Sequence, residues 1–600
     1  MFIAESIRRV WSSKISPGRG ELSFLCGWIP AVVKAPAAKS GGLFASAAPI
    51  FRPMESSTRE MTHRGIVARM SDAPDLLIIA AWTALICCIA TLRVDFIGDG
   101  IRHLAPILAD SRPQLGQPRW LLFPAFLFAI IKPLQMAGIV DSLGGAARVF
   151  LALDVFAGVA YMLLIRNWLL TRSVAASSRA AALLIAGMTM PMLRFSGDIV
   201  EVIIPASIAL AGLVYLASRP PEAVNQGLSV AAAAIAFAAL LYQGIILAVA
   251  LVPCAIPRGA TLRMRTIILF FAILASTPLL IVTMIVVNGA SARTAIHLML
   301  TGEENVLYRD RLESHRLPIW ERPVAATSLG AARSIIEIPD NRGVSGALQL
   351  LSHRATFIEG AADLGGCLLA LTMVLTGAVV VVRRREWRIA IAFAGILTLP
   401  TIRGYAYLKL YGLMPAVVAL VAAVSPPTIV FGAGAIVGAF NVTYLARDIS
   451  RDRRLARDIA PLYQSAGPAA CWLTTAWGPP IFGWPGWTCS MTQVLTDAHT
   501  DQLAPMIYEN NAAMVSSFRS CFCNSSAVYT DDVTESSKET VAALANYYRF
   551  AGIDSTRLLW NPQRGSTVFD RDGIVAYVYA RPSQSEICDS LKSATTNTSR

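Results

Sequence analysis

Apolar runs of membrane-spanning length recur along most of this chain, and they constrain its fold more than any other feature. They lie between Pro74 and Leu445, and the first of them, Pro74–Leu92, reads PDLLIIAAWTALICCIATL. An α-helix of this length crosses the hydrocarbon core of a bilayer and satisfies its own backbone hydrogen bonds there. Charged residues make up only 15% of the chain, against about 25% in soluble domains. The sequence therefore predicts an all-α polytopic membrane domain over residues 71–446, with about ten or eleven transmembrane helices.

Arginines cluster in short loops between the apolar runs, which is the usual sign of the cytoplasmic side. These loops are Arg166–Arg179, Arg258–Arg265 and Arg383–Arg388. All three loops lie on the cytoplasmic side if two conditions hold. Trp120–Val140 must insert only partly into the membrane, and Leu228–Ile256 must form two helices that are separated at the LYQG sequence. The alternative, a full crossing at Trp120–Val140 with one unbroken LYQG helix, leaves Arg166–Arg179 outside. The net charge of +13 follows from such loops, so we expect membrane lipids and no nucleic acid as partners.

The two ends of the chain differ from this membrane body. Residues 1–70 carry ten Lys or Arg and four acids without a spanning run, which predicts a basic, disordered N-terminal tail. Residues 461–600 carry five cysteines, which favours disulfides in an oxidising compartment, with a zinc site as the less favoured alternative because no CxxC pair occurs. The run Ser566–Ala580 predicts a β-hairpin turning at Asp572-Gly573, so we expect a small soluble α+β domain. We place it in the periplasm, although the basic segment Arg447–Asp458 argues for the other side.

Polar residues gather at three places where an outer edge of the membrane is expected. Ionisable groups at the edge of a bilayer are costly and therefore invite a functional explanation. Carboxylates there can take a proton from a hydroxyl or bind a cation, and cations can hold a phosphate. Ordinary helix caps, surface ion pairs and interfacial anchors are the alternatives. The clusters are Arg93, Asp95, Asp99, Arg102 and His103; Arg194, Asp198 and Glu201; and Arg403, Tyr405, Tyr407, Lys409 and Tyr411.

Four segments resemble the GT-C class of membrane glycosyltransferases, such as protein mannosyltransferases and aminoarabinose transferases. RVDFIGDGIRH, followed by Phe123-Pro124, is similar to the acidic first outer loop of that class. PMLRFSGDIVE is similar to its second acidic position, and RGYAYLKLYGLMP to its late basic, tyrosine-containing segment. LYQGIILAVALVP is in keeping with its middle helices. The resemblance covers roughly residues 71–445 and implies a GT-C-like membrane domain.

The resemblance also implies a mechanism. An isoprenoid phosphate would present a sugar at the outer face, and Asp95 or Asp99 would activate the acceptor hydroxyl. Asp198 and Glu201 would orient the acceptor or assist the base. Arg403 and Lys409 would neutralise the departing lipid phosphate. The expected substrate-binding residues are Arg102, His103, Arg403, Tyr405 and Lys409.

The function expected from this resemblance is a hexosyl- or pentosyltransferase of a bacterial inner membrane. It would move a sugar from a polyprenyl-phosphate donor to a glycan, lipid or protein of the cell envelope. It needs no nucleotide site, and we predict no protein metal site, although a divalent cation could take part. Three alternatives remain: a polysaccharide polymerase or ligase that uses the long polar segment Asn288–Gly360, a transporter, and a non-enzymatic envelope assembly protein.

Overall fold

The computed structural model describes most of the apolar runs and part of the C-terminal region. The described residues are 73–93, 103–104, 107, 121–140, 143–287, 292, 296, 335–336, 357–398, 411–467, 469–474, 487–490, 522–531, 565–571, 574–579, 584–586 and 588–589. The predicted N-terminal tail, the helix expected over residues 541–552 and most of the polar segment 288–356 lie outside them. Six of the candidate site residues do so as well, namely Asp95, Asp99, Arg102, Arg403, Tyr405 and Lys409.

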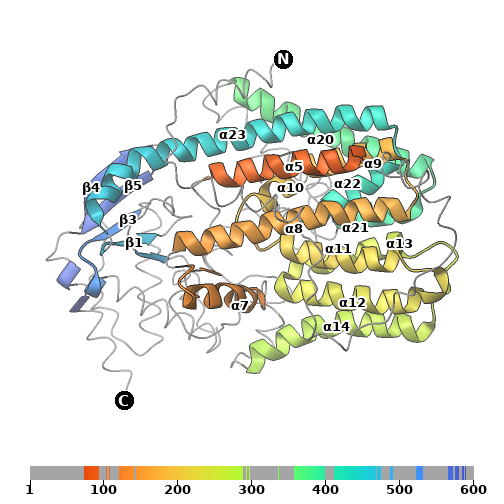
Figure 1. The fold of residues 1–600 in the computed structure, drawn as a ribbon, viewed down its shortest axis with the longest axis horizontal. Helices are drawn as coiled ribbons and strands as arrows, with labels where there is room; N and C mark the ends of the chain where they lie inside the picture. The colour runs from red at the N-terminus through yellow and green to blue at the C-terminus, as the bar shows by residue number, and fades with distance from the viewer. Residues whose placement is uncertain are drawn as a thin grey trace, which may run out of the picture. The chain divides into compact units, whose positions relative to one another are not determined.

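Helices make up the whole of the described membrane region (Figure 1). The N-terminal half holds α5 (Ala73–Leu92), α7 (Phe123–Met136), α8 (Leu143–Thr171), α9 (Ala176–Met188), α10 (Met190–Ser196), α11 (Ile203–Ala217), η2 (Pro221–Ala223) and α12 (Val224–Leu241). Next come η3 (Gln243–Leu251), α13 (Val252–Ala255), α14 (Met264–Val287), α20 (Phe357–Arg383), α21 (Trp387–Thr398), α22 (Met414–Ala423) and α23 (Pro427–Ala466).

Five helices in the described part of the chain are long and apolar enough to cross a membrane, or six if the bent pair α9–α10 forms one span. The other apolar runs there form shorter helices of 10–17 residues. Large apolar side chains face outward on α14, where Ile268 is 61% exposed and Leu279 66%. Such a surface suits lipid and not water. The chain is thus a multi-pass membrane protein with five or six candidate spans, which matches the predicted ten or eleven only in part.

Two helix breaks agree with the predicted course of the chain. The run around Trp120–Val140 contains only α7, whose 14 residues are too few to cross a bilayer. The LYQG run breaks at Tyr242, which has an extended backbone between α12 and η3. The helices therefore follow the version with a short α7 and a split LYQG pair.

Ion pairs gather the predicted cytoplasmic loops at one end of the helical body, which we call the arginine end. Glu386 forms ion pairs with Arg172 at 3.6 Å and with Arg258 at 2.9 Å, so it joins loops from three parts of the sequence. Beside them, buried Asp75 at the start of α5 pairs with Arg179 and, at 3.5 Å, with Arg166.

The C-terminal region contains a five-stranded sheet of order β2-β1-β3-β5-β4. Its strands are β1 (Cys471–Thr474), β2 (Trp487–Ser490), β3 (Val528–Asp531), β4 (Gly565–Arg571) and β5 (Ile574–Tyr579). β4 and β5 pair antiparallel with Arg571 opposite Ile574, which confirms the predicted hairpin. β1 pairs parallel with β2 and β3. A disulfide joins Cys523 to Cys588, and Cys471 is also disulfide-bonded, as the cysteine content predicts.

Candidate active site

Three carboxylates and one guanidinium group are buried together at the end of the helical body opposite the arginine end. Asp154 lies on α8, and Asp198 and Glu201 lie on the turn between α10 and α11; all three are 0% exposed. Arg93 directly follows α5 and is 6% exposed. We call these four residues the carboxylate cluster.

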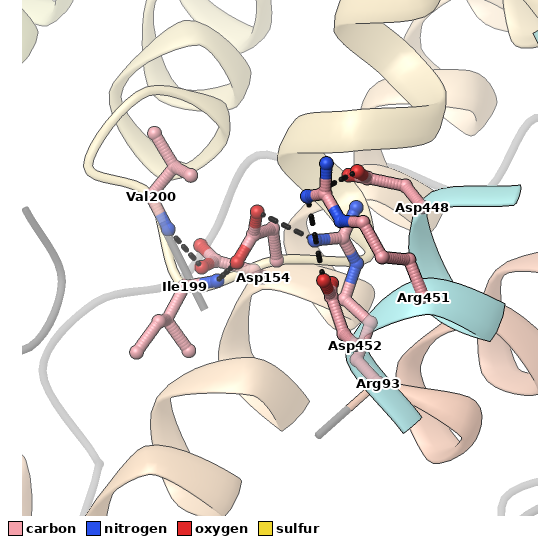
Figure 2. Close-up of polar contacts among 8 residues, drawn as sticks. Arg93, Asp154, Ile199, Val200, Asp448, Arg451 and Asp452 are labelled. Carbon is pink, nitrogen blue, oxygen red and sulfur yellow. Dashed lines mark hydrogen bonds and ion pairs between the residues drawn. The ribbon is translucent and has the colours of Figure 1, made fainter. Parts of the chain in front are cut away.

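Short polar contacts hold the cluster in place (Figure 2). Arg93 Nη1 donates to Asp198 Oδ2 at 3.0 Å, and Asp198 Oδ1 accepts from the backbone N–H of Ile199 at 2.9 Å. Asp154 Oδ2 accepts from the backbone N–H of Val200 at 3.2 Å. Asp154 therefore anchors the same turn that carries Asp198 and Glu201.

Part of the cluster's hydrogen-bonding capacity is unused within the described part of the chain. There, Asp154 Oδ1 and the Nε and Nη2 atoms of Arg93 are buried without a hydrogen-bond partner. Burying a charged group is expensive unless it is paired and hydrogen-bonded. Among the described residues, three carboxylates therefore share their surroundings with one buried guanidinium group. Carboxylates in such a setting can accept a proton or bind a hydroxyl group.

A sharp break between α9 and α10 sets the direction of α10, the short helix that leads to the turn with Asp198. The two helices are bent by 62°, because Pro191 has no backbone N–H to donate to the carbonyl of Gly187. The Trp82 Nε1–H of α5 donates to that carbonyl instead, at 2.8 Å. Asn441 Nδ2 of α23 donates to the next carbonyl, Met188 O, at 2.7 Å. Two other helices thus stabilise the break and, through it, the position of Asp198.

Close packing fixes α10 against its neighbours. A Cβ atom on Gly158 of α8 would collide with Ser196 of α10. On the other side of the cluster, Gly412 packs so closely on Val202 that a Cβ atom there would also collide. The Gly412 carbonyl accepts from the hydroxyl of Tyr161 at 3.2 Å. The end of the predicted RGYAYLKLYG segment therefore lies beside the turn of Glu201.

The first charged residues of the segment Arg447–Asp458 lie beside Arg93 (Figure 2). Arg451 Nη2 bonds to Asp448 at 3.0 Å and to Asp452 at 3.4 Å, and Asp452 interacts electrostatically with Arg93. This segment of α23 thus lies at the carboxylate end, as the predicted course of the chain requires despite its basic composition.

The structure brings together some of the predicted site residues and adds others. Asp198 and Glu201 lie in the cluster with Arg93. His103 is buried with its ring edge-on to Phe123, the ring centroids being 5.2 Å apart. Sequence reasoning did not identify Asp154 or Asn441 as candidates, although each is a single polar residue within an apolar run, which is the signal that could have revealed them.

Within the described residues, no group of three or more His, Cys, Asp or Glu side chains could hold a metal ion. Participation of a divalent cation stays a prediction.

No family model and no curated protein matches the chain. Among solved structures, ArnT from Cupriavidus metallidurans, determined with undecaprenyl phosphate and in the apo state, is similar at 12% identity. The match covers 85% of this chain and 98% of ArnT with a TM-score of 0.34. An oligosaccharyltransferase from Archaeoglobus fulgidus, tethered to an acceptor peptide, is similar at 11% identity. That match covers 84% of this chain and 74% of the oligosaccharyltransferase chain, with a TM-score of 0.38. Both proteins are GT-C membrane glycosyltransferases, the class that the sequence motifs resemble.

Proposed function

We propose that this protein is a membrane glycosyltransferase that moves a sugar from a polyprenyl-phosphate donor to a hydroxyl-bearing acceptor of the cell envelope. The observation that carries the proposal is the carboxylate cluster, buried at the end of an apolar helical body where the predicted outer loops begin. The donor class follows from the resemblance of the sequence motifs to the GT-C class.

In this reaction the bond between the sugar's anomeric carbon and the lipid phosphate breaks as the acceptor oxygen bonds to that carbon. A carboxylate takes the proton of the acceptor hydroxyl. Asp95 or Asp99 is the proposed base, and Asp198 and Glu201 orient the acceptor. The ion pair of Arg93 with Asp198 supports this assignment, since Arg93 stands two residues before Asp95 in the sequence.

The other predicted residues act on the lipid phosphate in this proposal. Negative charge develops on the phosphate as it departs, and nearby cations stabilise that charge. Arg403 and Lys409 are the proposed cations. Arg102, His103 and Tyr405 contribute to substrate binding.

The proposed reaction takes place on the outer face of a bacterial inner membrane. The disulfide between Cys523 and Cys588 supports a periplasmic C-terminal domain, because disulfides persist in oxidising compartments. The position of Asp452 beside Arg93 supports placing the start of that domain on the same side as the cluster.

The test is transfer activity of the purified full-length protein with a panel of polyprenyl-phosphate sugars. Asp198→Asn and Glu201→Gln remove a charge with little change of shape, and we expect each to lower kcat/KM by about 100-fold or more. Glu222→Gln, which neutralises an exposed acid on the loop before α12, is the matched control and keeps full activity.

Full activity of both Asp198→Asn and Glu201→Gln contradicts a catalytic role of the cluster. Full activity of both Asp95→Asn and Asp99→Asn removes the first outer loop from catalysis. Transfer of a whole lipid-linked chain in place of a single sugar reassigns the protein to a polysaccharide polymerase or ligase.

A further inference from the structure

Six exposed arginines lie on two loops at the arginine end, opposite the carboxylate cluster. We call them the arginine patch: Arg258, Arg263, Arg265, Arg383, Arg384 and Arg385. The first three precede or begin α14, and the last three end α20. The ion pair between Arg258 and Glu386, at 2.9 Å, joins two loops through residues that are 128 positions apart in the sequence.

Most of the positive charge in this patch is not balanced by acids. Glu386 serves both Arg258 and Arg172. The other five arginines of the patch form no ion pair with the described part of the chain. A folded surface with five unbalanced guanidinium groups in two adjoining loops attracts anions, and Arg binds phosphate oxygens bidentately.

The backbone of Arg385 places this arginine at a turn position that favours glycine. The N–H of Glu386 bonds to Val381 O at 3.1 Å and that of Arg385 to Val382 O at 3.0 Å, which is the Schellman ending of a helix. Arg385 occupies the left-handed position of this turn with φ +56°. Glycine is favoured there, and α7 does place Gly138 at the equivalent position, with φ +70°. The arginine is held in a conformation that a glycine would adopt without strain.

Apolar side chains exposed to lipid begin directly beside these charges. Trp387, the first residue of α21, is 58% exposed, and Met264, at the start of α14, is 69% exposed. Trp is enriched at the membrane–water interface. The arginine patch and its apolar neighbours therefore have the composition that is typical of the lipid-headgroup region.

We propose that the arginine patch binds the phosphate of anionic phospholipid headgroups in the surrounding leaflet. One headgroup phosphate accepts hydrogen bonds from guanidinium groups of both loops, so the lipid reinforces the junction that Glu386 forms between them. Clustered basic residues next to a span attract anionic lipid by about 1 kcal/mol each. This binding does not depend on the proposed function.

The test measures thermal unfolding of the purified full chain in detergent, with phosphatidylglycerol or phosphatidylcholine added. A ligand that binds only the folded protein raises Tm, so we expect a larger rise with phosphatidylglycerol. The triple variant Arg383→Gln, Arg384→Gln, Arg385→Gln should lose at least half of that difference. The matched control neutralises three arginines of α23 near the carboxylate end, Arg453→Gln, Arg454→Gln and Arg457→Gln, and should keep it.

The single variant Arg385→Gly separates binding from folding. It should raise Tm in the absence of lipid, because glycine adopts this backbone conformation without strain. It should also reduce the additional rise of Tm that phosphatidylglycerol causes. The proposal is overturned if the patch and control variants lose the difference equally, since that indicates net charge alone. It is also overturned if inorganic phosphate raises Tm as much as the lipid does.

Discussion

The two ends of the helical body both bury carboxylates against arginine, and they do so in opposite proportions. At the arginine end one buried carboxylate, Asp75, pairs with both Arg179 and Arg166. At the other end, the described residues include three buried carboxylates near one buried guanidinium group, that of Arg93. Two cations around one anion can hold helices together, because Asp75 of α5 pairs with Arg166 of α8 and Arg179 of α9. Neighbouring anions repel one another, and this arrangement agrees with the catalytic role that we propose for the carboxylate cluster.

The largest effect is expected on the free energy of unfolding, when one buried aspartate at each end of the helical body is changed to asparagine. Asp75→Asn removes the charge shared by Arg179 and Arg166, and breaking a buried ion pair costs about 3–5 kcal/mol. Asp154→Asn keeps an oxygen for the N–H of Val200 and relieves repulsion from the neighbouring carboxylates, so stability should not fall. Chemical unfolding in mixed micelles measures both. Equal losses would show that the two ends have the same structural role.

A smaller effect is expected from the side chain that stabilises the break before Asp198. Asn441 Nδ2 donates to Met188 O and to Ile335 O, each at 2.7 Å. Hydrogen bonds between membrane helices contribute about 0.6–1.7 kcal/mol each. Asn441→Leu should therefore cost about 1–3 kcal/mol and lower kcat, because the turn of Asp198 loses its support. Asn441→Gln should restore part of the activity. An Asn441→Leu variant with unchanged kcat would argue that α23 has no part in positioning the cluster.

Glycine positions give a third test, again with a matched pair. Gly158→Ala places a methyl group against Ser196 and must move α8 away from α10. Overpacking of this kind costs about 1–3 kcal/mol. Gly432→Ala in α23 meets no atom within 4 Å and should stabilise the helix by up to about 1 kcal/mol. Thermal unfolding of the two variants should thus change in opposite directions.

The smallest effect concerns the arginine end. Ser173 ends α8 with φ +54° and the same pair of hydrogen bonds as Arg385. Since it carries no charge, Ser173→Gly should raise stability by up to about 1 kcal/mol and leave the response to phosphatidylglycerol unchanged. A reduced lipid response in this variant would mean that the shape of the turns, and not the arginines, determines lipid binding.

Local sequence predicted the parts of this fold that depend on local chemistry. The LYQG break and the pairing of β4 with β5 follow from polar or turn-forming residues within an apolar or alternating run. Asp198 and Glu201 were recognisable because they stand between two apolar runs, next to Arg194.

Contacts between distant residues were not predictable from the sequence. Arg93 and Asp198 are 105 residues apart, and only the packing of α5 against α8 and α9 brings them together. Asp154 was overlooked because the run that contains it is otherwise a clean span. The length of α23 was also underestimated, since the predicted span ended at Leu445, whereas the charged residues that follow continue the helix to Ala466.

The uninterrupted course of α23 has a mechanical consequence. At 1.5 Å per residue, its 40 residues form a rod of about 60 Å that passes Arg93 and leads towards β1. A change in the length of such a helix both shifts and rotates the residues that follow it. One residue inserted between Asp452 and Pro461 would turn everything that follows by about 100° about the helix axis. The residue count of this helix therefore sets the direction in which the chain leaves it, so insertions in this stretch should be tolerated mainly in whole turns.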